Sequence, residues 1–158
     1  MNKKINPYRV PIQVAVYCYR NINGKFLWLM LKRATLTNPC WQGVTGAPFE
    51  DESLGDAARR ELLEETGLQP MSIVQSSYHY SYPIPVYNKH KFASEVTEIT
   101  EYVFVAELDS GCENITLTDE HSEYRWVTFD EAQKLLWWAE NKASLRVALD
   151  MALKEHKK

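Results

Sequence analysis

The chain has 158 residues, of which 45% are hydrophobic, and a formal net charge of −3; this length suits one hydrophobic core and predicts a single domain over residues 1–158. The small negative charge argues against DNA or RNA as a partner, and the lack of a membrane-length apolar run or signal-peptide core argues against a membrane location. Three cysteines are an odd count without metal-ligand spacing, so we expect no disulfide framework or zinc site and a cytoplasmic location.

The first part of the chain predicts three strands. Alternating apolar residues at 11–19 predict one strand, and the apolar run at 25–32 predicts a second, central strand. Residues 21–24 supply a hairpin turn between them. A short strand is expected at 41–45, and it leads into an acidic segment bracketed by two glycines.

This acidic segment predicts a helix that Ser53 caps, that runs to about residue 66 and that Gly67 ends in a left-handed conformation. Glu61 and Glu65 are one turn apart and face the same way, with Glu64 on a neighbouring stripe. Like charges at such spacing destabilise a helix by a few tenths of a kcal/mol per pair. We therefore expect a cation, and clustered carboxylates suit Mg²⁺, with Mn²⁺ as a possible substitute.

Further strands are predicted beyond the helix. Residues 71–82 form a Tyr-rich extended segment that Pro83 and Pro85 break. The apolar runs at 97–108 and 123–127 predict two more strands.

The last part of the chain predicts helices. Thr128 and Glu131 make a capping box that opens a helical region through Trp138, and residues 142–154 predict a terminal amphipathic helix. Strands first paired by a hairpin and then separated by helices predict an α/β fold with a mixed sheet between helices.

The spacing of the acidic segment resembles the Nudix box at every fixed position, and nine specified residues make a chance match negligible. The matching residues are Gly46, Glu52, Arg60, Glu61, Leu62, Glu64, Glu65, Gly67 and Leu68. This resemblance implies a Nudix α/β/α sandwich with a loop-helix-loop that binds divalent metal and hydrolyses nucleoside diphosphates linked to another moiety. A solvated Glu-rich helix is the alternative interpretation of the charges alone.

The resemblance also implies roles for individual residues. The implied metal ligands are Thr45 (through its carbonyl), Glu61, Glu64, Glu65 and Glu120. Arg60 would orient the carboxylates, and by its spacing it can reach Glu64 one turn on. Glu52 would help to hold the loop. Thr45 stands where many members carry a second glycine, so its hydroxyl can also face substrate.

Outside the box, Glu120 is the late carboxylate carried over from the family, with Glu123 in reserve. His121 is expected to form hydrogen bonds or to gate the site, because hard Mg²⁺ favours oxygen ligands. Glu61 or Glu120 would accept the proton of the attacking water. Both alternatives stay open at this point.

Substrate would need cations for its phosphates and a surface for its heterocycle. Arg9 and Arg33, at the ends of the first two strands, would clamp the phosphates, unless they are simply solvated. Tyr80, with its alternating neighbours, would stack on the heterocycle, unless the tyrosines form a buried or edge face. The substrate-binding candidates are Arg9, Arg33, Thr45, Tyr80, Trp138 and Asn141. Of Trp137 and Trp138, we expect one to pack in the core and the other to border the pocket.

Matches along most of the chain resemble a bacterial subgroup of the family that acts on dihydroneopterin triphosphate or dATP. The predicted function is a Mg²⁺-dependent pyrophosphohydrolase that cleaves a (d)NTP or dihydroneopterin triphosphate to the monophosphate and pyrophosphate. Two alternatives remain: a Nudix pyrophosphatase for dinucleoside polyphosphates, NADH or capped RNA, and a non-catalytic nucleotide-sensing domain. The expected partner is a nucleotide or pterin triphosphate, and the chain can be a monomer or a homodimer.

Overall fold

A computed structural model describes residues 7–35 and 39–157. These residues contain a mixed sheet of seven strands, in which β1 (Ile12–Ile22) pairs parallel with β6 (Glu98–Leu108) and antiparallel with β2 (Lys25–Arg33). On the far side of β6 the sheet continues with β5 (Ser72–Pro83), while β7 (His121–Val127) pairs antiparallel with β2. The mixed central sheet expected from the sequence is confirmed.

The strands β1 and β2 pair only near their hairpin, at residues 19–22 and 25–28. Farther along, β4 (Val44–Gly46) pairs with β1, whereas β3 (Trp41–Gln42) pairs with β2. The chain changes partner at Gly43, where a Cβ would come within 2.8 Å of the Val16 carbonyl oxygen. The single strand expected over residues 41–45 is therefore wrong, because its two halves pair with different neighbours.

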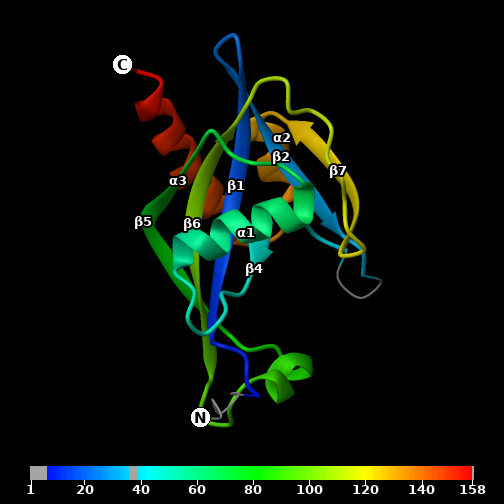
Figure 1. The fold of residues 1–158 in the computed structure, drawn as a ribbon, viewed down its shortest axis with the longest axis vertical. Coiled ribbons are helices and arrows are strands. Elements are labelled where there is room, and N and C mark those ends of the chain that lie inside the picture. The colour runs from blue at the N-terminus through cyan, green and yellow to red at the C-terminus, as the bar shows by residue number, and fades with distance from the viewer. Residues whose placement is uncertain (1–6, 36–38, 158) are drawn as a thin grey trace.

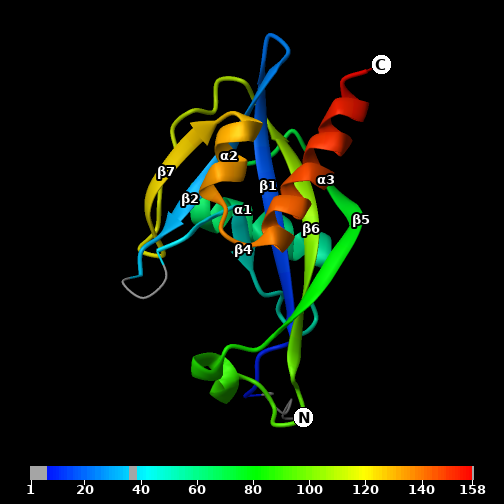
Figure 2. The same ribbon diagram turned by 180° about the vertical axis from the view of Figure 1, so that it is seen from behind.

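Helices cover both faces of the sheet. Figure 1 shows α1 (Leu54–Thr66) in front of the strands, and Figure 2 shows α2 (Phe129–Leu135) and α3 (Ala139–Glu155) on the opposite face. A short 3₁₀ helix, η1 (Val86–Lys91), lies at the end of the molecule where β5 and β6 are joined. This arrangement confirms the α/β/α sandwich. No helix in the described part of the chain is long and apolar enough to cross a membrane.

Alternation along β1 divides the core into two layers. Val14, Val16 and Cys18 pack with the apolar face of α1, and the intervening Ala15 and Tyr17 pack on the side of α3. Because successive side chains of a strand point to opposite faces, one strand contributes to both layers. Gln13, two residues before Ala15, therefore lies on the face of the sheet that α3 covers.

The ends of α1 are fixed as its sequence predicts. The Ser53 hydroxyl accepts a hydrogen bond from the Asp56 backbone N–H at 3.1 Å, and the helix stops at Gly67, whose φ is 76°. The Gly67 N–H donates to the Leu63 carbonyl oxygen at 2.8 Å. Both caps satisfy backbone groups that the helix itself leaves unpaired. They fix where the acidic side chains lie along the helix.

The boundary between the last two helices differs from the expectation. The capping box at Thr128 is present, but α2 ends at Leu135 and α3 begins at Ala139, before the expected residue 142. Trp138 is extended, with ψ at 142°, and caps α3 at its backbone. The expectation that one of the paired tryptophans packs in the core is also wrong, since Trp137 is 57% and Trp138 45% exposed.

Candidate active site

Arg60 ties the loop before α1 to the helix. Its guanidinium donates to Glu52 from Nε to Oε2 at 2.8 Å and from Nη2 to Oε1 at 2.9 Å. Further bonds run from Nη1 to Glu61 Oε1 at 2.9 Å and to Glu64 Oε2 at 3.2 Å, and from Nη2 to the Ala47 carbonyl at 3.0 Å. The predicted contact with Glu64 is present, but the two-point pair with Glu52 fixes the guanidinium plane.

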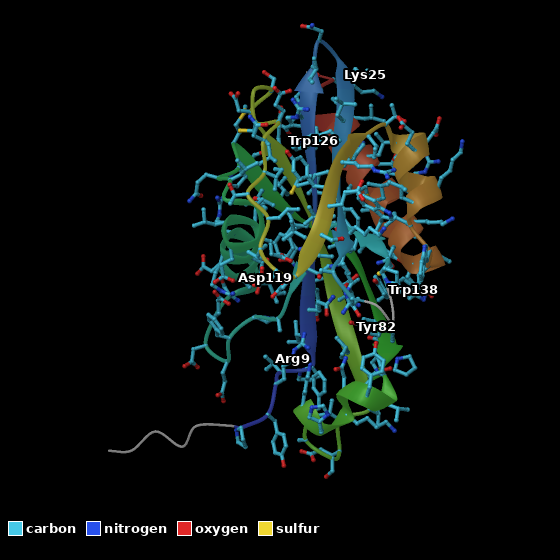
Figure 3. All side chains as sticks on the ribbon, turned by 90° about the vertical axis from the view of Figure 1, so that its right-hand side faces the viewer. Arg9, Lys25, Tyr82, Asp119, Trp126 and Trp138 are labelled. Atoms are coloured by element: carbon cyan, nitrogen blue, oxygen red, sulfur yellow. The ribbon has the colours of Figure 1, made fainter. Side chains whose placement is uncertain are left out.

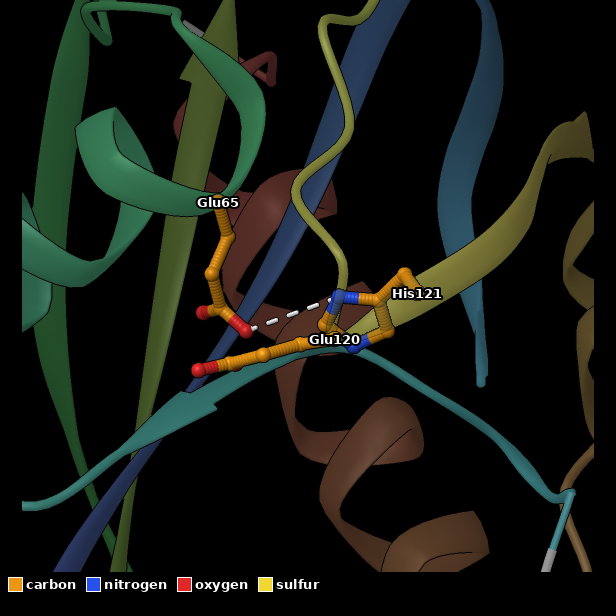
Figure 4. A group of neighbouring side chains, drawn as sticks. All are labelled: Glu65, Glu120 and His121. Carbon is orange, nitrogen blue, oxygen red and sulfur yellow. Dashed lines mark ion pairs between the residues drawn. The ribbon is translucent and has the colours of Figure 1, made fainter. Parts of the chain in front are cut away.

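Glu65 projects from the buried face of α1 and is only 3% exposed. Figure 4 shows its carboxylate pointing toward Glu120, which precedes β7, and His121, which begins it. The three side chains offer ligand atoms that all lie within 4.8 Å of one another, and Glu65 Oε1 is 3.8 Å from His121 Nδ1. Among the described residues, neither Glu65 oxygen nor His121 Nδ1 has a hydrogen-bond partner.

The electrostatics of this cluster favour a cation. Burial, and then the carboxylates of Glu61 and Glu120, raise the pKa of Glu65 to about 9. Burial also raises the pKa of Glu61, against the effect of the neighbouring arginine. For His121, burial and then the Arg33 charge lower the pKa to about 4, so its imidazole is neutral at pH 7. A divalent ion would relieve the carboxylate repulsion, and this oxygen-rich set with one nitrogen fits Mg²⁺ or Mn²⁺.

Two of the ligands predicted from the sequence, Glu65 and Glu120, meet in this cluster. Glu61 lies beside the first glycine of the box, since a Cβ on Gly46 would overlap the Glu61 carboxyl group. Glu64 instead has a side chain that is 54% exposed, and its carboxylate pairs with the arginine of the helix. The acidic side chains of α1 thus divide into the fully buried Glu65, the largely buried Glu61 and the exposed Glu64.

The remaining residues predicted near the metal are also placed. His121 Nε2 lies 3.1 Å from Gln42 Nε2, in keeping with the expected hydrogen-bonding role. The reserve candidate Glu123 lies outside the cluster and pairs with Arg125 at 3.1 Å on the surface. Thr45 lies on β4 and lines the cavity described next.

The acidic cluster opens into a cavity of about 1180 Å³. The predicted site residues that line it are Arg9, Arg33, Thr45, Glu61, Tyr80, Glu120, Trp138 and Asn141. Figure 3 shows Arg9, Tyr82 and Trp138 in the same half of the molecule, toward η1. The Arg9 guanidinium packs 5.6 Å from the centre of the Phe92 ring, and Lys91 adds a further cation to the lining. Carboxylates at one end and cations on the wall suit a phosphate chain with its metal.

The lining of the cavity also contains two polar residues that no sequence motif marks, Gln13 and Glu101. Glu101 is 3% exposed and accepts hydrogen bonds from Gln13 Nε2 at 2.8 Å and from the Tyr80 hydroxyl. Asn141 Nδ2 in turn donates to the Tyr80 oxygen at 3.0 Å. The alternation of side chains along β6 could have indicated that Glu101 is buried, because it lies on the same face as the buried, apolar Val103.

Comparisons with known proteins agree with this geometry. A family model described as the NUDIX domain matches residues 11–147. Dihydroneopterin triphosphate diphosphatase of Escherichia coli (strain K12) is 28% identical over 132 residues, which cover 81% of this chain and 85% of that protein. RNA pyrophosphohydrolase of Bartonella tribocorum is 29% identical over 145 residues and 82% of each chain. The structure of the E. coli dihydroneopterin triphosphate pyrophosphohydrolase superposes with a TM-score of 0.76 at 26% identity, covering 92% of this chain and 99% of that one.

Proposed function

This chain belongs to the Nudix hydrolase family, and from that premise we propose that it is a divalent-metal-dependent pyrophosphohydrolase. Its substrate would be a nucleoside triphosphate or dihydroneopterin triphosphate, and its products the monophosphate and pyrophosphate. The observation that carries this proposal is one cavity that is lined both by members of the acidic cluster and by a hydrogen-bonded polar network, the former Glu120 and His121 and the latter Glu101, Tyr80 and Asn141. Such a cavity can hold a phosphate chain and a heterocycle at the same time.

The metal would be held by Glu65 and Glu120, with Glu61 and the Thr45 carbonyl completing the set. Glu64 was also expected as a ligand, but its side chain is exposed and paired with Arg60, so it would only complete the acidic face. The buried, unpartnered oxygens of Glu65 are the observation that favours this assignment. A bound Mg²⁺ or Mn²⁺ neutralises phosphate charge and makes a nearby water more acidic. The neutral imidazole of His121 lies beside the Glu65 carboxylate and would shield it from bulk solvent.

The protein groups would bind the phosphates and move one proton. Glu61 or Glu120, both of which line the cavity, would accept the proton of the water that attacks phosphorus. Arg33 and Arg9 would neutralise the phosphate oxygens as charge builds up on the leaving pyrophosphate. Arg60 contacts no cavity surface itself; its bond to Glu61 would hold that carboxylate in place.

The two alternatives are tested by the same substrate panel. Purified protein is incubated with Mg²⁺ and dihydroneopterin triphosphate, dGTP, dATP, a dinucleoside tetraphosphate, NADH or 5′-triphosphorylated RNA, and pyrophosphate is separated from orthophosphate. We expect a monophosphate and pyrophosphate from a triphosphate monomer, and no product when EDTA replaces Mg²⁺. A kcat/KM higher for the dinucleotide, NADH or RNA than for the triphosphate monomers would show that the proposed substrate class is wrong. Ligand binding without turnover on any substrate would favour a nucleotide sensor.

A further inference from the structure

A row of polar side chains lines the same cavity as Glu61, Glu120 and His121. Gln13 on β1, Glu101 on β6 and Tyr80 on β5 are direct neighbours in the register of these three strands. Both oxygens of the Glu101 carboxylate accept hydrogen bonds, Oε1 from Gln13 Nε2 at 2.8 Å and Oε2 from the Tyr80 hydroxyl. All three residues line the cavity, so this carboxylate borders the space that a ligand would fill.

In the hydrogen-bond network around Glu101, each donor points toward the Glu101 carboxylate or toward a residue that donates to it. The Tyr82 hydroxyl donates to Gln13 Oε1 at 3.2 Å, and Asn141 Nδ2 donates to the Tyr80 oxygen at 3.0 Å. These second bonds orient the amide and the phenol so that both donate to Glu101. The network therefore presents Glu101 to the cavity as a hydrogen-bond acceptor.

Glu101 has unused acceptor capacity. A carboxylate offers about four acceptor sites, and the protein fills two of them. The side chain is 3% exposed, and no cation among the described residues pairs with it. Burial raises its pKa, while the bonds from Tyr80 and Gln13 oppose that rise. A buried acceptor in this position gains most from a ligand that brings N–H donors.

We propose that Glu101 selects substrates whose heterocycle presents a ring N–H beside an exocyclic amino group, the 2-amino-4-oxopyrimidine edge that guanine and pterins share. The two adjacent donors match the two carboxylate oxygens, as acidic side chains match amino groups of bases elsewhere. Adenine instead presents a ring nitrogen acceptor beside its amino group, and that lone pair would face the carboxylate. The inference rests on the proposed function and names the substrate class for the same cavity.

The first test compares substrates on the unaltered protein. The value of kcat/KM is measured with Mg²⁺ for dGTP, dITP, dATP and dihydroneopterin triphosphate. We expect dATP to be at least about a hundredfold poorer than the better of dGTP and the pterin, because a site built for donors rejects analogues that lack them. We expect dITP, which keeps the ring N–H and lacks the amino group, to lie between dGTP and dATP. The comparison of dGTP with the pterin identifies which of the two sources the cavity prefers.

The second test uses Glu101→Gln, with Glu98→Gln as a matched control on the exposed end of the same strand. We expect Glu101→Gln to lower kcat/KM for dGTP and the pterin by at least about tenfold, mainly through KM, and to leave dATP within about twofold. In the control variant, kcat/KM should stay unchanged for every substrate. Titration of dGMP and dAMP into both variants measures base preference without turnover, and we expect Glu101→Gln to weaken dGMP alone.

The outcomes separate the two proposals. A preference of the unaltered protein for dATP over dGTP and the pterin would overturn the role of Glu101, even if Glu101→Gln failed to fold. If Glu101→Gln lowered kcat/KM equally for all bases, Glu101 would have a structural role and no role in base selection. Absence of hydrolysis of every triphosphate would overturn the proposed function, while the dGMP and dAMP titrations would still decide base selection.

Discussion

At the scale of single residues, the carboxylates of α1 differ in how the protein satisfies them. Glu52 and Glu64 share the guanidinium of Arg60, so their charges are compensated within the protein. Glu65 is buried against Glu120 and His121, and among the described residues its two oxygens accept no hydrogen bond. We infer that this one residue makes the metal-free protein sensitive to pH.

The free energy of unfolding without metal should fall as pH rises. The fold raises the pKa of Glu65 from 4.5 to about 9, so between these values the folded state holds a proton that the unfolded state releases. The contribution of Glu65 to stability is then complete below about pH 4.5 and is lost toward pH 9, by up to about 1.4 kcal/mol per pH unit. Below pH 6.5 the lowered pKa of His121 contributes the opposite slope, so the net loss is expected above pH 6.5.

Urea unfolding in EDTA at several pH values between about 7 and 8.5, above the window in which His121 titrates, measures this loss. Glu65→Gln cannot ionise, and it should flatten the slope. Asp56→Asn, an exposed carboxylate on the same helix, should keep the slope of the unaltered protein. Equal slopes in the unaltered protein and Glu65→Gln would show that Glu65 does not titrate as the structure requires.

Gly46→Ala should separate activity from stability. The added Cβ would overlap the Glu61 carboxyl group, so that side chain must move. Misplacement of a reacting group by about 1 Å costs on the order of a hundredfold in rate, and we expect a loss of about tenfold to a hundredfold in kcat. Gly55→Ala, where an added Cβ meets open space, is the matched control. Activity within twofold of the unaltered protein in Gly46→Ala would mean that Glu61 has no fixed position in the reaction.

At the scale of elements, local sequence signals predicted the helix ends correctly, whereas the pairing of distant strands could not be predicted. Ser53, Gly67 and the Thr128 capping box are short-range signals, and the structure has helix ends at each of them. The split between β3 and β4 could not be predicted, because it depends on which neighbouring strand each half pairs with. The boundary before α3 was missed because residues 136–138 contain no glycine or proline to mark it.

The C-terminal cap of α1 can be tested by stability. Gly67 has a φ of 76°, which an alanine adopts only at a cost, although an added Cβ would make only ordinary contacts with Thr116. Gly67→Ala should lower the free energy of unfolding by about 1 kcal/mol. Gly55→Ala, inside the helix, should raise it by about half a kcal/mol. Chemical denaturation measures the free energy of unfolding of both variants. A Gly67→Ala protein as stable as the unaltered one would show that the backbone at residue 67 is not strained by a side chain.

At the scale of the whole molecule, the cavity joins segments that lie far apart in the sequence. The box predicted Glu61 and Glu65 of the acidic site, because they lie within one helix, whereas Glu120 and His121 reach it from the start of β7. The polar network around Glu101 depends on the parallel register of β1 with β6, which brings Gln13 beside Glu101 across 88 residues. Periodicity assigns each strand a face but says nothing of register, so this network required the structure.

The claim that Glu61 and Glu65 form the metal-dependent centre of a pyrophosphohydrolase is tested most directly by the rate of pyrophosphate release. The measurement uses the best triphosphate of the panel, saturating Mg²⁺, and the unaltered protein, Glu61→Gln, Glu65→Gln and Asp56→Asn as the control on the same helix. We predict that each Glu→Gln change lowers turnover by at least about a hundredfold with the fold intact, as the loss of single acid/base groups does, and that Asp56→Asn keeps its rate. Near-normal turnover in both Glu→Gln variants would contradict this assignment of the centre.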